Sequence, residues 1–461
     1  MTGEARPARS PELVTELEEL QRDTFGYFVH EASPGNGLVR DNTRYASPAS
    51  IAAVGLGLAC YAVAAERGFL TREEAAERVL VTLKFFDESP RGSGPEAVGD
   101  RGFFYHFLDL RTGRRAHGCE ISTMDSALLI AGALTAAAYF DRENEHEAAI
   151  RRLAESLYRE ADWEWALDGG LTLRHGWTPE GGFVPYRWQG YNEGLILYAL
   201  ALGSPSHPIP AESYAAWTAT YEWKKVYGVE YLYGGPLFLH QLSHVWIDFR
   251  GIQDDFMRAR GMDYFENSRR ATLVQQRYAE RNPRHLRGYS SRIWGITASD
   301  GPGPAVRKVG GRMRRFFDYC ARGVPRGPDD GTLSPWAVVA SLPFAPDIVL
   351  PTIASFLDRY PDMRTHYGFL CSFNPTFAGS GGGRKGWISR GYYGLDQGPV
   401  VLMIENFASG MIWDLIRRCR PIVDGLRRAG FTGGWLETGG SGGRKSGSGL
   451  ARTSRRKEKS S

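Results

Sequence analysis

Apolar and amphipathic segments alternate along most of the chain, and nearly all are long enough to form helices. The apolar members are residues 48–65, 123–140, 192–203, 234–247, 334–342 and 398–416. The amphipathic members are residues 72–88, 144–160, 211–223, 253–279, 346–360 and 420–430. Helices that are apolar on every side belong in the interior, and helices with one apolar face belong outside. The pattern therefore predicts an all-α fold, an (α/α)6 toroid or barrel, with short strands confined to loops.

The predicted connections are unequal in length. An apolar segment is followed closely by its amphipathic partner, whereas the return to the next apolar segment usually takes many residues, as in 89–122, 161–191 and 280–333. In such a barrel the long connections must all lie beside the N-terminal ends of the inner helices. Long ordered loops in a compact domain are usually functional. We therefore expect long loops on one face of the barrel, and the functional site among them.

The helical pattern, including an amphipathic stretch over 11–31, spans residues 11–438, which we expect to form one domain. Residues 1–10 are predicted to be a flexible N-terminus. Residues 439–461 are rich in Gly, Ser and basic residues and are predicted to be disordered. This tail carries a net charge of +6, which leaves about −2 for the rest of a chain whose net charge is +4. We therefore expect no nucleic-acid partner.

Composition excludes further classes of protein. Five cysteines without tight spacing argue against a disulfide framework and against a zinc site, so we expect no metal and no cofactor. The polar, acidic stretch 1–18 does not resemble a signal peptide, and no apolar run is long enough to span a membrane. We expect a cytoplasmic protein, or a periplasmic one if the start codon is misassigned. The sequence leaves the oligomeric state open.

Acidic residues gather where the apolar segments begin. Glu120 and Asp125 open the second segment, Glu193 opens the third, Asp300 lies in a long loop and Asp396 precedes the last segment. A single acid at such a position is most simply a helix N-cap. Several acids and many aromatic rings on one face are typical of glycoside hydrolysis, in which one carboxyl group protonates the leaving oxygen and a second activates water or attacks the sugar.

Rings and polar side chains near these acids are candidates for binding a sugar substrate. They are Trp163, Trp165, Trp188, Tyr191, His240, His244, Trp294, Trp387, Tyr392 and Gln397. His240 and His244 lie one turn apart, which is a zinc-binding spacing, but no Glu follows the first His as in metalloproteases. Hydrogen bonding to Asp248 or to a ligand is therefore the favoured interpretation of this pair.

Glu193 presents a physical tension. It lies at the start of a short apolar helix, and a helix N-terminus stabilises a carboxylate, which lowers its pKa. A general acid needs a raised pKa. Burial by Trp188 and Tyr191, or a neighbouring carboxylate, would have to outweigh the helix dipole.

Several motifs together resemble the bacterial glucoamylase-like family, which includes endo-β-1,2-glucanases and a domain of cyclic β-1,2-glucan synthases. The motifs are Glu120-x-Ser-Thr-x-Asp125, Trp188-x-Gly-Tyr-x-Glu193, Gly203-Ser-Pro-x-His-Pro208, Phe238-x-His-Gln-x-Ser-His244, Trp294-Gly-x-Thr-Ala-Ser-Asp300 and Gly394-x-Asp396-Gln-Gly-Pro399. The resemblance implies an (α/α)6 barrel, with Glu193 as the proton donor and Asp125 as an acid lining the cleft. Where the endoglucanases carry Asp-x-x-Glu, this chain has Ser122 and Asp125.

These observations predict a glycoside hydrolase that cleaves a glucan, with β-1,2-glucan as the first choice of substrate. Asp125 is the first choice as partner of Glu193, followed by Glu120, Asp300 and Asp396, and the resemblance favours inversion of the anomeric carbon. Two alternatives stay open: a non-catalytic glycan-binding barrel, and an exo-acting hydrolase of the glucoamylase type that acts on another glucan.

Overall fold

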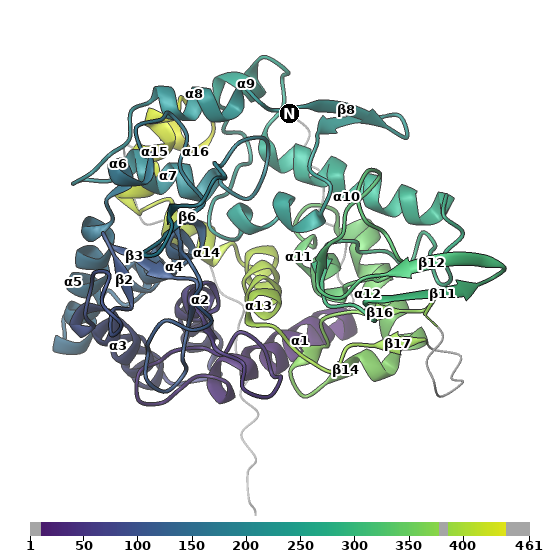
Figure 1. Cartoon of the computed structure of the whole chain (residues 1–461), viewed down its shortest axis with the longest axis horizontal. Coiled ribbons are helices and arrows are strands. Elements are labelled where there is room, and N and C mark those ends of the chain that lie inside the picture. Colours follow the sequence, from purple (N-terminus) through teal and green to yellow (C-terminus); the bar gives the residue numbers. More distant parts are fainter. Residues whose placement is uncertain (1–10, 378–385, 439–461) are drawn as a thin grey trace, which may run out of the picture.

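The computed structural model describes residues 11–377 and 386–438, so the predictions for residues 1–10 and for the tail at 439–461 fall outside the described residues. Helices dominate the described part of the chain (Figure 1). The helices are α1 (Pro11–His30), α2 (Ile51–Arg67), α3 (Arg72–Glu88), α4 (Thr123–Tyr139), α5 (Glu145–Glu160), α6 (Trp163–Ala166), α7 (Leu195–Gly203), α8 (Glu212–Thr218), η1 (Leu237–His240), η2 (Leu242–Val245), α9 (Asp255–Arg258), α10 (Tyr264–Arg281), α11 (Pro335–Ala340), α12 (Pro346–Arg359), η3 (Pro361–Met363), α13 (Gly394–Ala408), α14 (Met411–Ile416), α15 (Arg420–Arg428) and α16 (Trp435–Thr438).

The most apolar segments contact one another in chain order. α2 packs against α4, α4 against α7, and α11 against α13, which returns to α2. The η1–η2 segment joins α7 to α11, because the Ser243 hydroxyl accepts a hydrogen bond from the Ile196 N–H and the Gln241 amide donates to the Ala337 carbonyl. The more amphipathic helices lie outside this series, with α1 against α13, α3 against α5 and α15 against α7.

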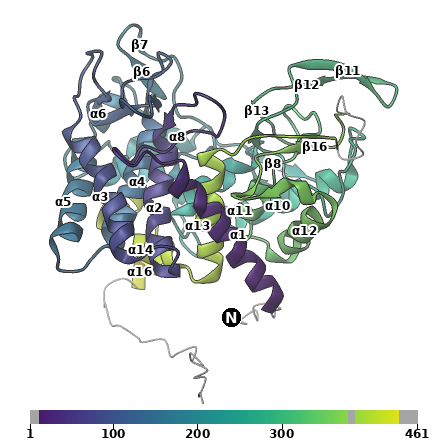
Figure 2. The same cartoon turned by 90° about the horizontal axis from the view of Figure 1, so that it is seen from below.

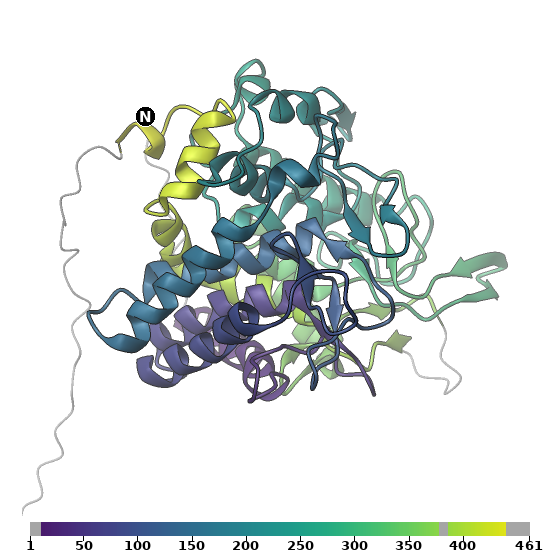
Figure 3. The same ribbon diagram turned by 60° about the vertical axis from the view of Figure 1, so that its left-hand side comes forward.

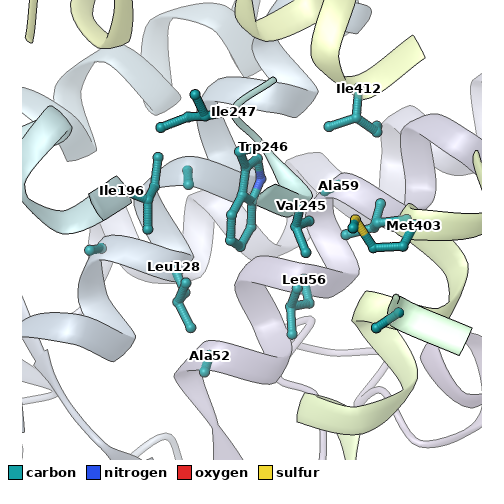
Figure 4. Close-up of a cluster of buried hydrophobic side chains, with 14 of the residues drawn as sticks. Ala52, Leu56, Ala59, Leu128, Ile196, Val245, Trp246, Ile247, Met403 and Ile412 are labelled. Atoms are coloured by element: carbon teal, nitrogen blue, oxygen red, sulfur yellow. The ribbon is translucent and has the colours of Figure 1, made fainter. Parts of the chain in front are cut away.

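The centre of the molecule is a continuous apolar core. Figure 4 shows the Trp246 ring among side chains from several inner segments, including Leu56 of α2, Leu128 of α4, Ile196 of α7 and Met403 of α13. All five side chains are buried. Burial of this kind is the main favourable term in folding, and it explains why these segments are apolar on every side.

Glycines allow two pairs of helices to approach closely. A Cβ atom on Gly132 of α4 would lie 1.9 Å from the Gly55 carbonyl oxygen of α2. A Cβ atom on Gly425 of α15 would lie 1.8 Å from the Ala199 carbonyl oxygen of α7. Any larger residue at these positions would force the helices apart, so the glycines fix the spacing of these two helix pairs.

Some predicted segments differ from the observed ones. Residues 234–247 form two 3-10 turns instead of an α-helix, because Gln241 between them leaves the helical conformation and directs its side chain to α11. The segment at 398–416 starts earlier, at Gly394, and is interrupted at Gly410, whose φ is 79°. The segment at 211–223 is helical only to Thr218.

Short strands lie in the long connections. They are β1 (Ala49–Ser50), β2 (Gly99–Asp100), β3 (Phe103–Tyr105), β4 (Phe107–Leu108), β5 (Ile121–Ser122), β6 (Gly176–Thr178), β7 (Gly182–Phe183), β8 (Trp223–Val226), β9 (Val229–Leu232), β10 (Ala298–Ser299), β11 (Ala305–Val309), β12 (Arg312–Phe316), β13 (Cys320–Ala321), β14 (Arg364–Thr365), β15 (Gly368–Phe369), β16 (Phe373–Asn374) and β17 (Trp387–Ile388). The largest sheet has the order β2-β3-β5-β6-β7, and β5 leads directly into α4.

The loop strands rise on one side of the helices. Figure 2 shows β6 and β7 at one edge of this side and the β11–β13 region at the other edge, and Figure 3 shows the same strands projecting from the helical layer. In residues 11–377 and 386–438, none of the helices has the length and apolar character needed to cross a bilayer.

Candidate active site

A cavity of about 530 Å³ opens on the face that carries the long loops. Its volume lies within the range of small-molecule binding sites. Its walls are formed by Asp41, Ser50, His106, Phe107, Glu120, Ser122, Met124, Asp125, Leu128, His175, Trp188, Glu193, Phe238, Leu242, Ala298, Tyr319, Trp336, Tyr393, Leu395 and Asp396. The cavity therefore brings together four of the five acids singled out in the sequence, from segments far apart in the chain.

Glu193 is placed by the turn that leads into α7. The Asn192 side chain accepts a hydrogen bond from the Gly194 N–H at 2.9 Å, and the Ser243 hydroxyl donates to the Glu193 carbonyl. Burial raises the pKa of the Glu193 carboxyl to about 7, with a smaller contribution from the Asp125 charge and an opposing one from a backbone hydrogen bond. Burial thus outweighs the backbone hydrogen bond, and near neutral pH a large fraction of Glu193 carries a proton.

Asp125 occupies the first turn of α4, whose N-cap is Ser122. The Ser122 hydroxyl accepts a hydrogen bond from the Asp125 N–H at 3.1 Å and donates one to the Asp125 carboxylate. On its other side, Asp125 Oδ1 lies 3.6 Å from His106 Nε2. The carboxylate is therefore held in one orientation by a hydroxyl and an imidazole.

His106 connects two of the acids, and the sequence analysis did not select it. Its Nδ1 lies 3.0 Å from Glu120 Oε1, and its ring stacks on Phe107 with centroids 4.0 Å apart. Burial opposes the charged imidazole, but Asp125, Glu120 and Asp41 together outweigh burial and raise the pKa of His106 to about 9. Hydrogen bonding to His106 in turn lowers the pKa of Glu120. Near neutral pH the cavity thus contains an imidazolium between two carboxylates.

Asp396 and Asp41 form another acidic part of the wall. Asp396 lies inside the first turn of α13 and not before the helix, which corrects the predicted boundary. Burial raises the pKa of Asp396 well above its usual value, and the charges of Asp41 and Asp300 raise it further. Burial also raises the pKa of Asp41, although Asn42 donates a 2.7 Å hydrogen bond to its carboxylate. Asp41 was not predicted; its position in the long connection at 32–47 was the available signal.

Asp300 does not reach the cavity wall formed by the described residues, which corrects its prediction as a catalytic candidate. It is fully buried, and Arg44 Nη2 lies 2.5 Å from its carboxylate. Ser389 donates a hydrogen bond to the same oxygen at 2.7 Å. Because two partners from different loops hold this carboxylate, Asp300 ties the rim of the cavity together.

Trp188 is the one predicted ring residue found on the cavity wall among the described residues. Its ring stacks on His175 with centroids 3.9 Å apart, and its indole N–H donates to Thr123 Oγ1 at 3.0 Å. His175 was not predicted, and burial lowers its pKa. A neutral imidazole against an indole provides a flat surface at this side of the cavity.

Other predicted substrate-binding residues lie in the core, away from the described cavity wall. Trp163 and Trp294 have no exposed surface. His240 Nε2 lies 3.1 Å from the Gly234 carbonyl, and His244 Nε2 lies 2.9 Å from Ser268 Oγ. These four predictions are therefore corrected: large rings and buried imidazoles here fill space and satisfy backbone and hydroxyl groups.

The remaining five candidates are also absent from the wall formed by the described residues. Tyr191 stacks on Tyr264, Gln397 donates to the Phe369 carbonyl, and Trp165 packs on Phe183. Tyr392 packs on Tyr367 and Trp387 lies in β17. These residues support the segments behind the wall. The rings that do line the cavity include Phe238, Trp336, Tyr319 and Tyr393, and none of them was predicted as a site residue. Phe238 opens one of the motifs quoted above, which was the available signal for it.

Comparison with known proteins gives the family. The model of the Glycoamylase family, described as putative glucoamylase, matches residues 185–420, about half of the chain, and the chain belongs to this family. The chain is 31% identical to a putative glucoamylase of Bacteroides uniformis ATCC 8492, with a TM-score of 0.80, over 94% of this chain and 100% of that one.

Two further relatives carry more specific names. An endo-β-1,2-glucanase of Chitinophaga pinensis, solved with sophorotriose and glucose, is 27% identical with a TM-score of 0.81, over 93% of this chain and 100% of that one. An exo β-1,2-glucooligosaccharide sophorohydrolase (non-reducing end) of Parabacteroides distasonis is 27% identical over 450 residues. That match covers 89% of this chain and 57% of the relative, so this chain spans little more than half of the relative's length.

Proposed function

We propose that this chain is a glycoside hydrolase that cleaves β-1,2-linked glucan, with Glu193 as the general acid. The observation that carries the proposal is the raised pKa of Glu193, about 7, in a cavity lined by other carboxyl groups and by rings. A carboxyl that keeps its proton near neutral pH can transfer that proton to the glycosidic oxygen as the bond to the anomeric carbon breaks.

Asp125 is the proposed partner of Glu193. A carboxylate that takes a proton from water allows the water oxygen to attack the anomeric carbon, which inverts its configuration. Ser122 and His106 hold Asp125 in a fixed orientation, and the raised pKa of His106 keeps a positive charge beside it near neutral pH. Glu120 contacts the opposite ring nitrogen of His106 and is proposed to orient that ring.

The β-1,2 linkage is proposed from the relatives. Two relatives, one matched over its whole chain and one over just part of its length, are both named for action on β-1,2-glucan or its oligosaccharides. Their names differ in endo and exo action, so the shared element is the linkage. The partner implied for this chain is an oligo- or polysaccharide.

We further propose that residues 11–438 form one (α/α)6 toroid. The succession of contacts from α2 through α4, α7, η1–η2, α11 and α13 back to α2 supports this architecture. The carboxyl groups of Asp125, Glu193 and Asp396 lie at or near the N-terminal ends of three of these segments, as a toroid with one loop-rich face requires.

The proposal is tested by incubating the protein with glucans of defined linkage, β-1,2, β-1,3, β-1,4 and α-1,4, and analysing the products by size. We expect cleavage of the β-1,2 polymer and oligomers alone. Cleavage of α-1,4-glucan from its end would favour a glucoamylase-type enzyme. Tight binding of a glucan without any product would favour the non-catalytic barrel. Following the anomer released at early times would show whether the configuration inverts.

A further inference from the structure

Exposed aromatic side chains are rare in this protein. Of the Phe, Trp and Tyr side chains in residues 11–377 and 386–438, just Tyr45, Tyr186 and Tyr319 are exposed, at 102%, 68% and 51%. An aromatic ring that is exposed to water contributes little to the stability of the fold and can promote aggregation. Exposed rings next to a cavity therefore indicate a surface that binds a ligand.

All three tyrosines belong to loops that frame the cavity. The Tyr186 ring lies 6.0 Å from the ring of His175, which lines the cavity. Tyr319 itself borders the cavity, and its ring lies 5.7 Å from that of Tyr393. Tyr45 follows Arg44, whose guanidinium group binds the buried Asp300. The rings are therefore exposed on segments that are anchored to the wall.

Tyr186 and Tyr319 flank the cavity on different sides. Tyr186 follows β7, whereas Tyr319 lies between β12 and β13. Figure 2 shows these two groups of strands at opposite edges of the loop face. The cavity wall includes His175, which precedes β6, and Tyr319, which precedes β13. A chain that entered from one group of loops and left at the other would therefore pass through the cavity.

We propose that Tyr186 and Tyr319 are outer sugar-binding positions on the two sides of the cavity, at which rings pack against the C–H faces of glucose units in a glucan that extends beyond it. Tyr45 adds a further ring near the rim that Asp300 anchors. The inference rests on the proposed function and deepens it, because a substrate held on both sides of the cavity is cut at an internal bond. The enzyme would then prefer long chains to short ones.

The test compares kcat/KM on a long β-1,2-glucan with kcat/KM on the β-1,2-linked trisaccharide. We expect Tyr186→Ala and Tyr319→Ala each to lower the ratio of long-chain to trisaccharide activity about three- to tenfold, as expected for one lost ring contact. Tyr186→Phe and Tyr319→Phe keep the ring and should keep the ratio. The double Ala variant should lose roughly the product of the two factors, because the sites are separate.

Leu171→Ala is the matched control, because Leu171 is also exposed, at 54%, in the connection that carries Tyr186 but has no ring. Its ratio should equal that of the wild type. An unchanged ratio in both Tyr→Ala variants, or an equal loss in the Phe variants, would overturn the inference while leaving the hydrolase proposal standing. A wild-type protein that cleaves neither substrate would instead overturn the proposed function.

Discussion

Carboxyl groups near the two ends of the inner helices differ in whether an arginine pairs with them. At the face of short connections, Glu405 accepts bidentate hydrogen bonds from Arg67, and Glu147 accepts them from Arg72. At the loop face, the described contacts give Glu193 and Asp396 no arginine or lysine partner. Acids paired with an arginine stabilise the fold, whereas acids desolvated without an arginine or lysine partner are available for chemistry.

Glu147 and Glu193 make the comparison quantitative, since they are the same residue type. Burial raises the pKa of Glu147, but hydrogen bonds from Arg72 and from the Arg142 N–H outweigh burial and lower it to about 2. For Glu193, where burial is the largest influence and no cation opposes it, the pKa rises to about 7. The counter-charge, and not burial alone, therefore separates the lowered pKa of Glu147 from the raised pKa of Glu193.

The largest expected effect is the loss of activity on removing the unpaired acid. Glu193→Gln keeps the shape of the side chain and abolishes its acidity. We expect kcat on β-1,2-glucan to fall about 10²- to 10⁴-fold, the usual contribution of general acid catalysis, with substrate binding retained. Steady-state kinetics and the dissociation constant for the glucan measure both quantities. Near-normal turnover in this variant would remove Glu193 from the mechanism.

A smaller loss is expected from the imidazole that holds Asp125. His106→Gln removes a positive charge 3.6 Å from the Asp125 carboxylate. Because the Asp125 carboxylate then loses the imidazole that orients it, we expect kcat to fall about tenfold at neutral pH, which steady-state kinetics measure.

His175→Gln serves as the matched control for the imidazole. His175 also lines the cavity, but its pKa is lowered and it is neutral at working pH. Its replacement should lower kcat less than the His106 change does. An unchanged kcat in the His106 variant would show that His106 does not orient Asp125.

The acids of the candidate site were predicted from the sequence better than the other residues of the site. Asp125, Glu193 and Asp396 were found because helical periodicity and loop length fix where inner segments begin, and the acids stand at those beginnings. His106 and Asp41 lie in irregular connections, where no periodic pattern predicts the direction of a side chain. Trp163 and His240 were chosen for their chemistry, but the same rings and imidazoles also fill cores, and in this fold they do.

The fold was predictable for the same physical reason. The apolar segments at 48–65 and 123–140 correspond closely to α2 and α4, because a helix that is apolar on every side is stable only when it is buried. The segment at 234–247 was not a helix, since Gln241 is held by partners on α11 that are distant in the sequence. Such tertiary hydrogen bonds leave no local signal.

Replacing Glu147, the acid paired with Arg72, should lower the stability and leave the activity unchanged, which is the reverse of replacing Glu193. Glu147→Gln removes the bidentate partner of Arg72, which keeps the more exposed Asp141 at 3.3 Å, so we expect the free energy of unfolding to fall by about 1–3 kcal/mol at neutral pH. Because the folded-state pKa of Glu147 is below its unfolded value, this loss should shrink as the pH falls from about 4.5 towards 2. Denaturant unfolding at several pH values measures it, and kcat should stay at the wild-type level.

The smallest expected effect concerns the stability that the protein loses because Glu193 is desolvated in the cavity. The folded-state pKa of Glu193 is above its unfolded value, so ionisation destabilises the fold as the pH rises from about 4.5 through 7. Glu193→Gln should therefore gain stability relative to the wild type as the pH rises to 8, and lose this advantage near pH 4. Equal pH dependence in the two proteins would mean that Glu193 titrates normally.

The central claim is that Glu193 acts as an acid because it is buried without a counter-charge. The pH dependence of kcat/KM on β-1,2-glucan tests it most directly, since this quantity reports ionisations of the free enzyme. We predict a basic limb centred at about 7, where Glu193 loses its proton. A plateau that continues to about pH 9, where His106 titrates, would contradict the assignment of Glu193 as the acid. So would an activity that already declines near the usual glutamate pKa.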